Sequence, residues 1–102
     1  LWVSHWTTGH VGCYDPVKKT WREWPLPRKA RTYSVWVDEK DKVWLAEWTR
    51  NALIRSDPVS ERFTAFPSDR PDARVRQMLG RTGEIWGAES ANDRLVRIAT
   101  DF

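Results

Sequence analysis

The side chains best suited to chemistry recur at a constant spacing. Glu47 and Glu89 are 42 residues apart, and His5 lies 42 residues before Glu47. Carboxylates are ligands for hard cations such as Mg²⁺, and an imidazole can act as a general base. We therefore take Glu89 and Glu47 as candidate catalytic residues, Glu89 also as a candidate metal ligand, and His5 as a candidate base. The structural alternative is that each Glu pairs with an Arg or caps a turn.

The same spacing extends over the whole chain, which indicates an internal repeat. Trp2, Trp44 and Trp86 occupy one repeat position, and the Asp-Pro-Val of residues 15–17 recurs at 57–59. Because the carboxylates follow the repeat, their spacing is not by itself a sign of a site. Recurrence also favours a packing role for most of the eight Trp.

Short runs rich in Val, Trp, Tyr and Phe lie between turn residues, which is typical of β-strands. In the second repeat we expect strands at 33–37, 43–47, 52–56 and 62–66, forming an antiparallel meander. Four strands per 42 residues predict an all-β fold of β-propeller blades. A solenoid of stacked sheets is the structural alternative.

The phase of the repeat divides the chain into three parts. Residues 1–32 should hold three strands of one blade, 33–74 a complete blade, and 75–102 three strands of a last blade. This amounts to about two and a half blades of a probable seven-bladed propeller, with open faces at both ends. We expect the remaining blades of the same propeller, or identical chains, to cover them. Three copies of 102 residues approach the length of seven 42-residue blades, which suggests a trimer.

The meander also predicts which side chains gather. In a blade, the start of the first strand and the end of the second lie at the same sheet edge, where ligands are commonly bound. Around the catalytic candidates we therefore expect a ligand-binding face that combines aromatic rings with arginines. Its residues are Trp6, Tyr33, Trp48, Arg74 and Arg76.

Composition limits the remaining possibilities. The net charge of +3 is small and scattered, so no nucleic-acid partner is expected, and no apolar run is long enough for a transmembrane helix. One cysteine, Cys13, excludes an internal disulfide, and we expect it to be a buried small hydrophobe. We interpret Asp15 and Asp57 as turn formers. No signal peptide is visible, and a periplasmic and a cytoplasmic location are equally open.

Three segments carry a resemblance to a known family. Residues 43–47 read Val-Trp-Leu-Ala-Glu, 51–55 read Asn-Ala-Leu-Ile-Arg, and 24–27 read Trp-Pro-Leu-Pro. This pattern resembles the blades of the bacterial virginiamycin B lyase (streptogramin lyase) family. The resemblance implies a seven-bladed propeller that confers antibiotic resistance by opening a cyclic depsipeptide through Mg²⁺-assisted elimination.

The same resemblance implies a catalytic His at the start of a blade's innermost strand. The matching positions here are Tyr33 and Val75, so that His is absent from this segment. Two hypotheses follow: a lyase whose base comes from other blades, or a non-catalytic propeller that binds a small molecule or a protein on the same face.

Overall fold

The computed structural model describes residues 1–48, 51–68 and 73–100, and ten β-strands account for most of them. The expected strands are present, each within one residue of its predicted bounds. Residues 69–72 of the expected complete blade and 101–102 of the last one lie outside the described residues. The strands are β1 (Trp2–His5), β2 (His10–Asp15), β3 (Thr20–Pro25), β4 (Thr32–Val37), β5 (Val43–Glu47), β6 (Ala52–Asp57), β7 (Arg62–Pro67), β8 (Val75–Arg81), β9 (Glu84–Glu89) and β10 (Arg94–Ala99).

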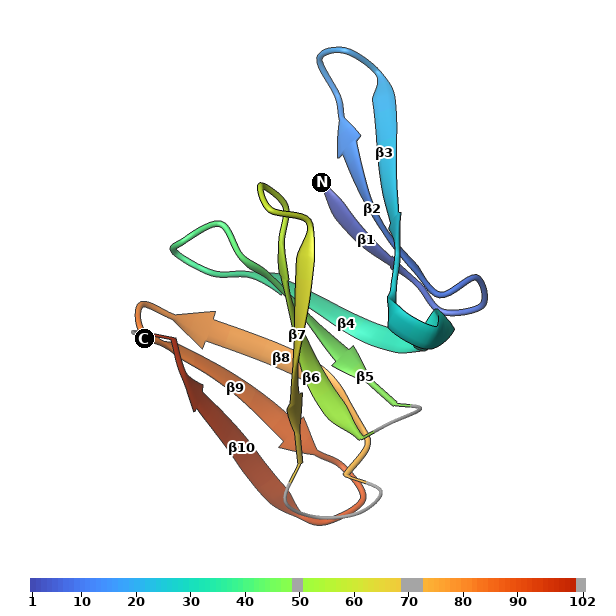
Figure 1. Ribbon diagram of the computed structural model, residues 1–102. Coiled ribbons are helices and arrows are strands. Elements are labelled where there is room, and N and C mark those ends of the chain that lie inside the picture. Colours follow the sequence, from blue (N-terminus) through green and yellow to red (C-terminus); the bar gives the residue numbers. More distant parts are fainter. Residues whose placement is uncertain (49–50, 69–72, 101–102) are drawn as a thin grey trace.

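These strands form three antiparallel meanders in which every strand pairs with its neighbour in the sequence. The first sheet is β1-β2-β3, the central sheet β4-β5-β6-β7, and the last sheet β8-β9-β10. Figure 1 shows the three sheets side by side, with the central sheet between the other two. The predicted propeller-blade architecture is therefore confirmed.

The turns between strands repeat in geometry more closely than in sequence. Asp15 Oδ1 accepts hydrogen bonds from the amides of Val17 and Lys18, and Asp57 Oδ1 accepts them from Val59 and Ser60. Both aspartates thus form the turns that the sequence predicts. Left-handed backbone recurs at the repeat distance of 42, in Lys19 and Glu61 and again in Asn51 and Asp93.

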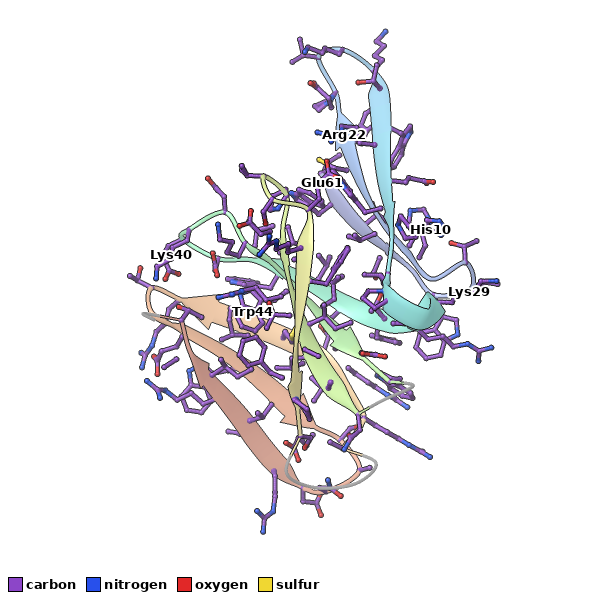
Figure 2. The ribbon with its side chains drawn as sticks, viewed as in Figure 1. His10, Arg22, Lys29, Lys40, Trp44 and Glu61 are labelled. Carbon is purple, nitrogen blue, oxygen red and sulfur yellow. The ribbon has the colours of Figure 1, made fainter. Side chains whose placement is uncertain are left out.

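Two apolar clusters join the three sheets. The first joins the first and central sheets, where the Trp2 ring stacks on Trp24 at 5.4 Å between centroids. The second joins the central and last sheets around Trp44, which is fully buried and donates from Nε1 to Asp38 Oδ2 at 2.8 Å. Figure 2 shows Trp44 between these two sheets. The first cluster contains Val11, Trp24, Leu26, Ala30, Val43, Leu45 and Ile54, and the second Trp44, Ala46, Leu53, Val75, Met78 and Ile85.

One prediction of a buried side chain is wrong, and one tryptophan is more exposed than its repeat position suggests. Cys13 is only half-buried, because it lies at the rim of the first cluster. Trp21 is 54% exposed although its repeat counterpart Phe63 packs against the first cluster. The reason is position: Trp21 lies on the outward side of the first sheet, where the described residues contain no further sheet.

The outward faces of the first and last sheets carry exposed apolar side chains. Val3 is 37% exposed, whereas its repeat counterpart Leu45 in the central sheet is fully buried. Leu95 on the last sheet is 69% exposed, whereas its counterpart Leu53 is 3% exposed. The same repeat positions are therefore buried wherever a sheet lies on both sides.

At the edge remote from residues 47–48, a polar contact ties the central sheet to the last one. Glu39 Oε1 accepts hydrogen bonds from the Gly83 amide and the Thr100 hydroxyl, both at 3.0 Å, and Lys40 Nζ donates to the Thr100 carbonyl at 2.7 Å. Lys40 is labelled in Figure 2, in the turn between β4 and β5 on the side of the last sheet. Hydrogen bonds from the Glu39 backbone amide and from Gly83 lower the pKa of the Glu39 carboxyl.

Candidate ligand-binding face

Three aromatic residues meet at the end of the sheets where the sequence places them. Trp6 lies in the turn after β1, Tyr33 lies in β4, and Trp48 directly follows β5. Trp6 meets both other rings edge-on, with centroids 6.3 Å from Tyr33 and 5.5 Å from Trp48. Tyr33 and Trp48 stack at 5.9 Å. These three residues are called the aromatic cluster below.

Trp48 connects this cluster to all three sheets. Its indole Nε1 donates to the Val75 carbonyl of the last sheet at 2.8 Å, and its amide donates to the Arg31 carbonyl at 2.9 Å. The guanidinium of Arg76 lies 5.5 Å from the centroid of the Trp48 ring, within cation–π range. The structure thus brings together four of the five expected ligand-binding residues.

Arg74, the fifth, is exposed beside this face. Its backbone is left-handed, with φ of 53°, and its carbonyl accepts a hydrogen bond from the Ser90 hydroxyl at 2.7 Å. The hydrogen bond that Arg74 makes here is therefore a backbone contact, directly before β8.

Sequence reasoning missed two cations at the same end. An open hollow of about 390 Å³ is lined by Trp6, Lys29, Arg31 and Trp48. Lys29 ends a 3₁₀ turn, Pro27–Lys29, that the sequence analysis did not predict. The sequence does contain a signal for this turn, because Pro is favoured at the first helical position and Pro27 occupies that position.

Gly9 fixes this 3₁₀ turn against the turn that carries Trp6. Its φ is +71°, and a Cβ at this position would lie 2.7 Å from the Lys29 Cα. The Gly9 carbonyl also accepts a hydrogen bond from the Leu26 amide at 2.8 Å. Only glycine allows so close a backbone approach in this conformation.

Glu47 and Glu89 come together, but inside the molecule and away from the hollow. They are only 6% and 3% exposed, and both line a cavity of about 10 Å³ between the central and last sheets. The two Glu89 oxygens accept hydrogen bonds from Ser68 Oγ and Asn92 Nδ2, each at 3.4 Å. The cavity walls also include Leu53, Phe66, Val75 and Val96.

The size of this cavity shows whether its two carboxylates could hold the Mg²⁺ that the resemblance implies. Its volume holds about one water molecule, whereas protein-bound Mg²⁺ usually keeps several. Within 1–48, 51–68 and 73–100, no three His, Cys, Asp or Glu side chains are grouped so that they could hold a metal ion. The described residues alone therefore do not fit a hydrated Mg²⁺, and a site that includes Glu89 would need ligands from elsewhere.

His5 lies at the expected end of β1, but its ring turns away from the aromatic cluster. Nε2 lies 3.7 Å from a Glu23 carboxylate oxygen, on the outward face of the first sheet. The ring passes over Gly12, where a Cβ would come within 2.9 Å of Nε2. The structure thus brings His5 to Glu23 and not to Glu47 or Glu89.

A helix long and apolar enough to cross a membrane is not found in the part of the chain that the structure describes.

The three meanders and their 42-residue repeat define a segment of a β-propeller. No protein-family profile matches the chain. No curated protein matches it at the level of sequence. Comparison with solved structures, however, confirms the resemblance at the level of the fold.

Virginiamycin B lyase from Staphylococcus aureus superposes on 98% of this chain with a TM-score of 0.87 and 22% sequence identity. A streptogramin B lyase structure gives a TM-score of 0.88 at 20% identity, again over 98% of the chain. A catalytically inactive variant of the S. aureus enzyme, solved with quinupristin, gives 0.87 at 22% identity over the same share. The chain covers 34% of each of these proteins, so it has the fold of about a third of a streptogramin B lyase.

Proposed function

We propose that this chain forms part of the ligand-binding face of a β-propeller, with the aromatic cluster at its centre. The observation that supports this proposal is the convergence of Trp6, Tyr33, Trp48 and Arg76 from three sheets at one end. Trp6 is 37% and Tyr33 50% exposed, so their rings remain accessible. Exposed rings with a few polar groups nearby are typical of small-molecule sites.

The second candidate is the elimination reaction of a streptogramin lyase, which the likeness in fold favours. In that reaction a base removes a C–H proton, a C–C double bond forms, and the ester C–O bond breaks so that a carboxylate leaves. A bound Mg²⁺ would polarise the ester carbonyl. In this segment Glu89 and Glu47 would lie near such an ion only if other blades supplied further ligands, because their own cavity is small.

The base of such a reaction would also come from outside this segment. Tyr33 and Val75 stand where the resemblance implies a His, and the His5 ring is turned toward Glu23. Binding without turnover is therefore the function that the described geometry supports better.

The proposed partners follow from the two open faces. Since Val3 and Leu95 occupy positions that are buried in the central sheet, we propose that further blades of the same kind cover them. These blades come either from the same chain or from identical chains, and the trimer is one arrangement of the second kind.

Quinupristin is the first probe, because it accompanies a structure of this fold. The complete propeller that contains this segment is titrated with quinupristin by calorimetry, with and without Mg²⁺. We expect binding that Trp6→Leu weakens about fivefold or more, since ring stacking contributes roughly 1–3 kcal/mol. Trp21→Leu is the matched control, because Trp21 is also exposed but lies on another face.

Chromatography with mass spectrometry separates the two candidate functions. Elimination gives a linear product of unchanged mass, whereas hydrolysis adds one water. Binding with no linear product supports the binding function, and Mg²⁺-dependent appearance of the product supports the lyase. Quinupristin that neither binds nor opens would contradict both for this ligand class.

A further inference from the structure

The hollow beside the aromatic cluster combines two chemistries in one small area. The described residues that line it are two tryptophans, Trp6 and Trp48, and two cations, Lys29 and Arg31. At about 390 Å³ it is in the size range of small-molecule sites. Lys29 is labelled in Figure 2, beside the turn that carries Trp6. No Asp or Glu is among the described residues that line the hollow.

Backbone contacts hold both cations beside the rings. The Lys29 amide donates to the Leu26 carbonyl at 3.1 Å, and the Leu26 amide donates to Gly9 in the Trp6 turn at 2.8 Å. On the other side, the Arg31 carbonyl accepts from the Trp48 amide at 2.9 Å. The segment that carries Lys29 and Arg31 is thus bonded at one end to the loop of Trp6 and at the other to Trp48.

Among the described residues, Glu47 and Glu89 line a different cavity. Glu47 directly precedes Trp48 in the sequence, yet its carboxylate lies in the cavity between the central and last sheets, as Glu89 does. Both are almost fully buried, so neither carboxylate is open to a ligand in the hollow. The charged side chains in the described lining are those of Lys29 and Arg31, and the guanidinium of Arg76 lies nearby, over the Trp48 ring.

We infer that this hollow binds an organic anion with a planar aromatic ring. This inference rests on the proposed function and names its ligand class. The ring lies against Trp6 and Trp48, where stacking is favourable, and the anionic group lies between Lys29 and Arg31. A neutral sugar offers no anionic group to Lys29 and Arg31.

Three related probes test the inference on the full chain: naphthalene-2-carboxylate, its neutral carboxamide, and cyclohexanecarboxylate. Binding is followed through the indole N–H signals in ¹H–¹⁵N spectra, which report on Trp6 and Trp48 individually. We expect the aromatic carboxylate to bind at least about fivefold more tightly than the other two probes, because each of them lacks one of the two contacts.

Lys29→Gln should weaken the aromatic carboxylate about two- to fivefold and reduce the salt dependence of its binding. Lys18→Gln is the matched control, because Lys18 lies in the exposed turn between β2 and β3, outside the hollow. Adenosine monophosphate, measured against adenosine, shows whether a phosphate can take the place of the carboxylate. Tighter binding of either anion than of its neutral partner supports the inference.

Two outcomes separate this inference from the proposed function on which it rests. Equal binding of the carboxylate and its carboxamide, with shifts at Trp6 and Trp48, would overturn the anionic preference and leave a ligand-binding face. No shift of either indole signal with any probe at millimolar concentration would overturn the inference, whereas the proposed binding function is tested independently by quinupristin.

Discussion

The two interfaces between the sheets share their apolar packing but differ in their polar contacts. Each contains a Trp from the same repeat position: Trp2 in the first interface and Trp44 in the second. In the second, Trp44 is fully buried and bonded to Asp38, and Glu39 and Lys40 bond across to Gly83 and Thr100. In the first, the ion pair of Arg22 with Glu61 is exposed. The repeat therefore accounts for the apolar contacts of both interfaces, whereas the polar contacts differ from one interface to the other.

The largest expected effect on this difference comes from truncating the two equivalent tryptophans. We expect Trp44→Ala to lower the free energy of unfolding by about 3–5 kcal/mol, because it creates a large cavity and leaves Asp38 without the indole N–H. Trp2→Ala should cost about 1–3 kcal/mol, since Trp2 is only partly buried. Urea unfolding of the full chain measures both. Equal losses would show that the two interfaces contribute alike.

A second test concerns the contact that positions the hollow. Gly9→Ala and Gly83→Ala both place a Cβ on left-handed backbone, which costs about 1–3 kcal/mol. Only at Gly9 would the Cβ also meet backbone, at 2.7 Å from the Lys29 Cα, whereas nothing lies within 4 Å of it at Gly83. We expect Gly9→Ala to be the more destabilising of the two and to weaken binding in the hollow. A smaller loss for Gly9→Ala than for Gly83→Ala would contradict the close approach.

The smallest effect is expected at the polar contact of the second interface. Hydrogen bonds hold the pKa of Glu39 below its ordinary value of 4.5, so its ionised form stabilises the folded chain. That contribution is complete above about pH 4.5 and is lost as the pH falls through the lowered pKa. Glu39→Gln should therefore lower the Tm at neutral pH and have less effect in acid.

Glu61→Gln, which removes the exposed ion pair of the first interface, serves as the control. Its Tm should stay close to that of the unsubstituted chain at every pH, because exposed pairs contribute little. Comparing each variant with the unsubstituted chain at the same pH is necessary, since Arg97 and Arg81 also hold the pKa of Glu84 at about 2. A Glu39→Gln Tm that follows the control would show that the charge of Glu39 does not stabilise the second interface.

Local patterns were sufficient to predict much of the fold. Strand bounds follow from the alternation of apolar runs and turns, and Asp15 and Asp57 form their turns with bonds to residues only two and three positions away. The convergence of Trp6, Tyr33 and Trp48 was also predictable, because it depends only on which ends of a meander share an edge. These features need no information about distant side chains.

The features that were missed depend on contacts between different strands and turns. The direction of the His5 ring depends on Gly12 and Glu23 in the other strands of the first sheet, and Glu89 accepts a hydrogen bond from Ser68, which directly follows β7. Lys29 enters the hollow through a 3₁₀ turn whose position is fixed by Gly9. A repeat indicates equivalent backbone positions, but it does not indicate how each side chain is turned.

The left-handed turn residues have a consequence for how this architecture can vary. Lys19 and Glu61 share one conformation at equivalent turns, and so do Asn51 and Asp93, although the residues differ within each pair. What the equivalent hairpins share is the number of residues between the strands, because that number determines where the chain must reverse. One such hairpin can therefore be replaced by another of the same length, so a blade can acquire a new recognition loop without a change in the strands that carry it.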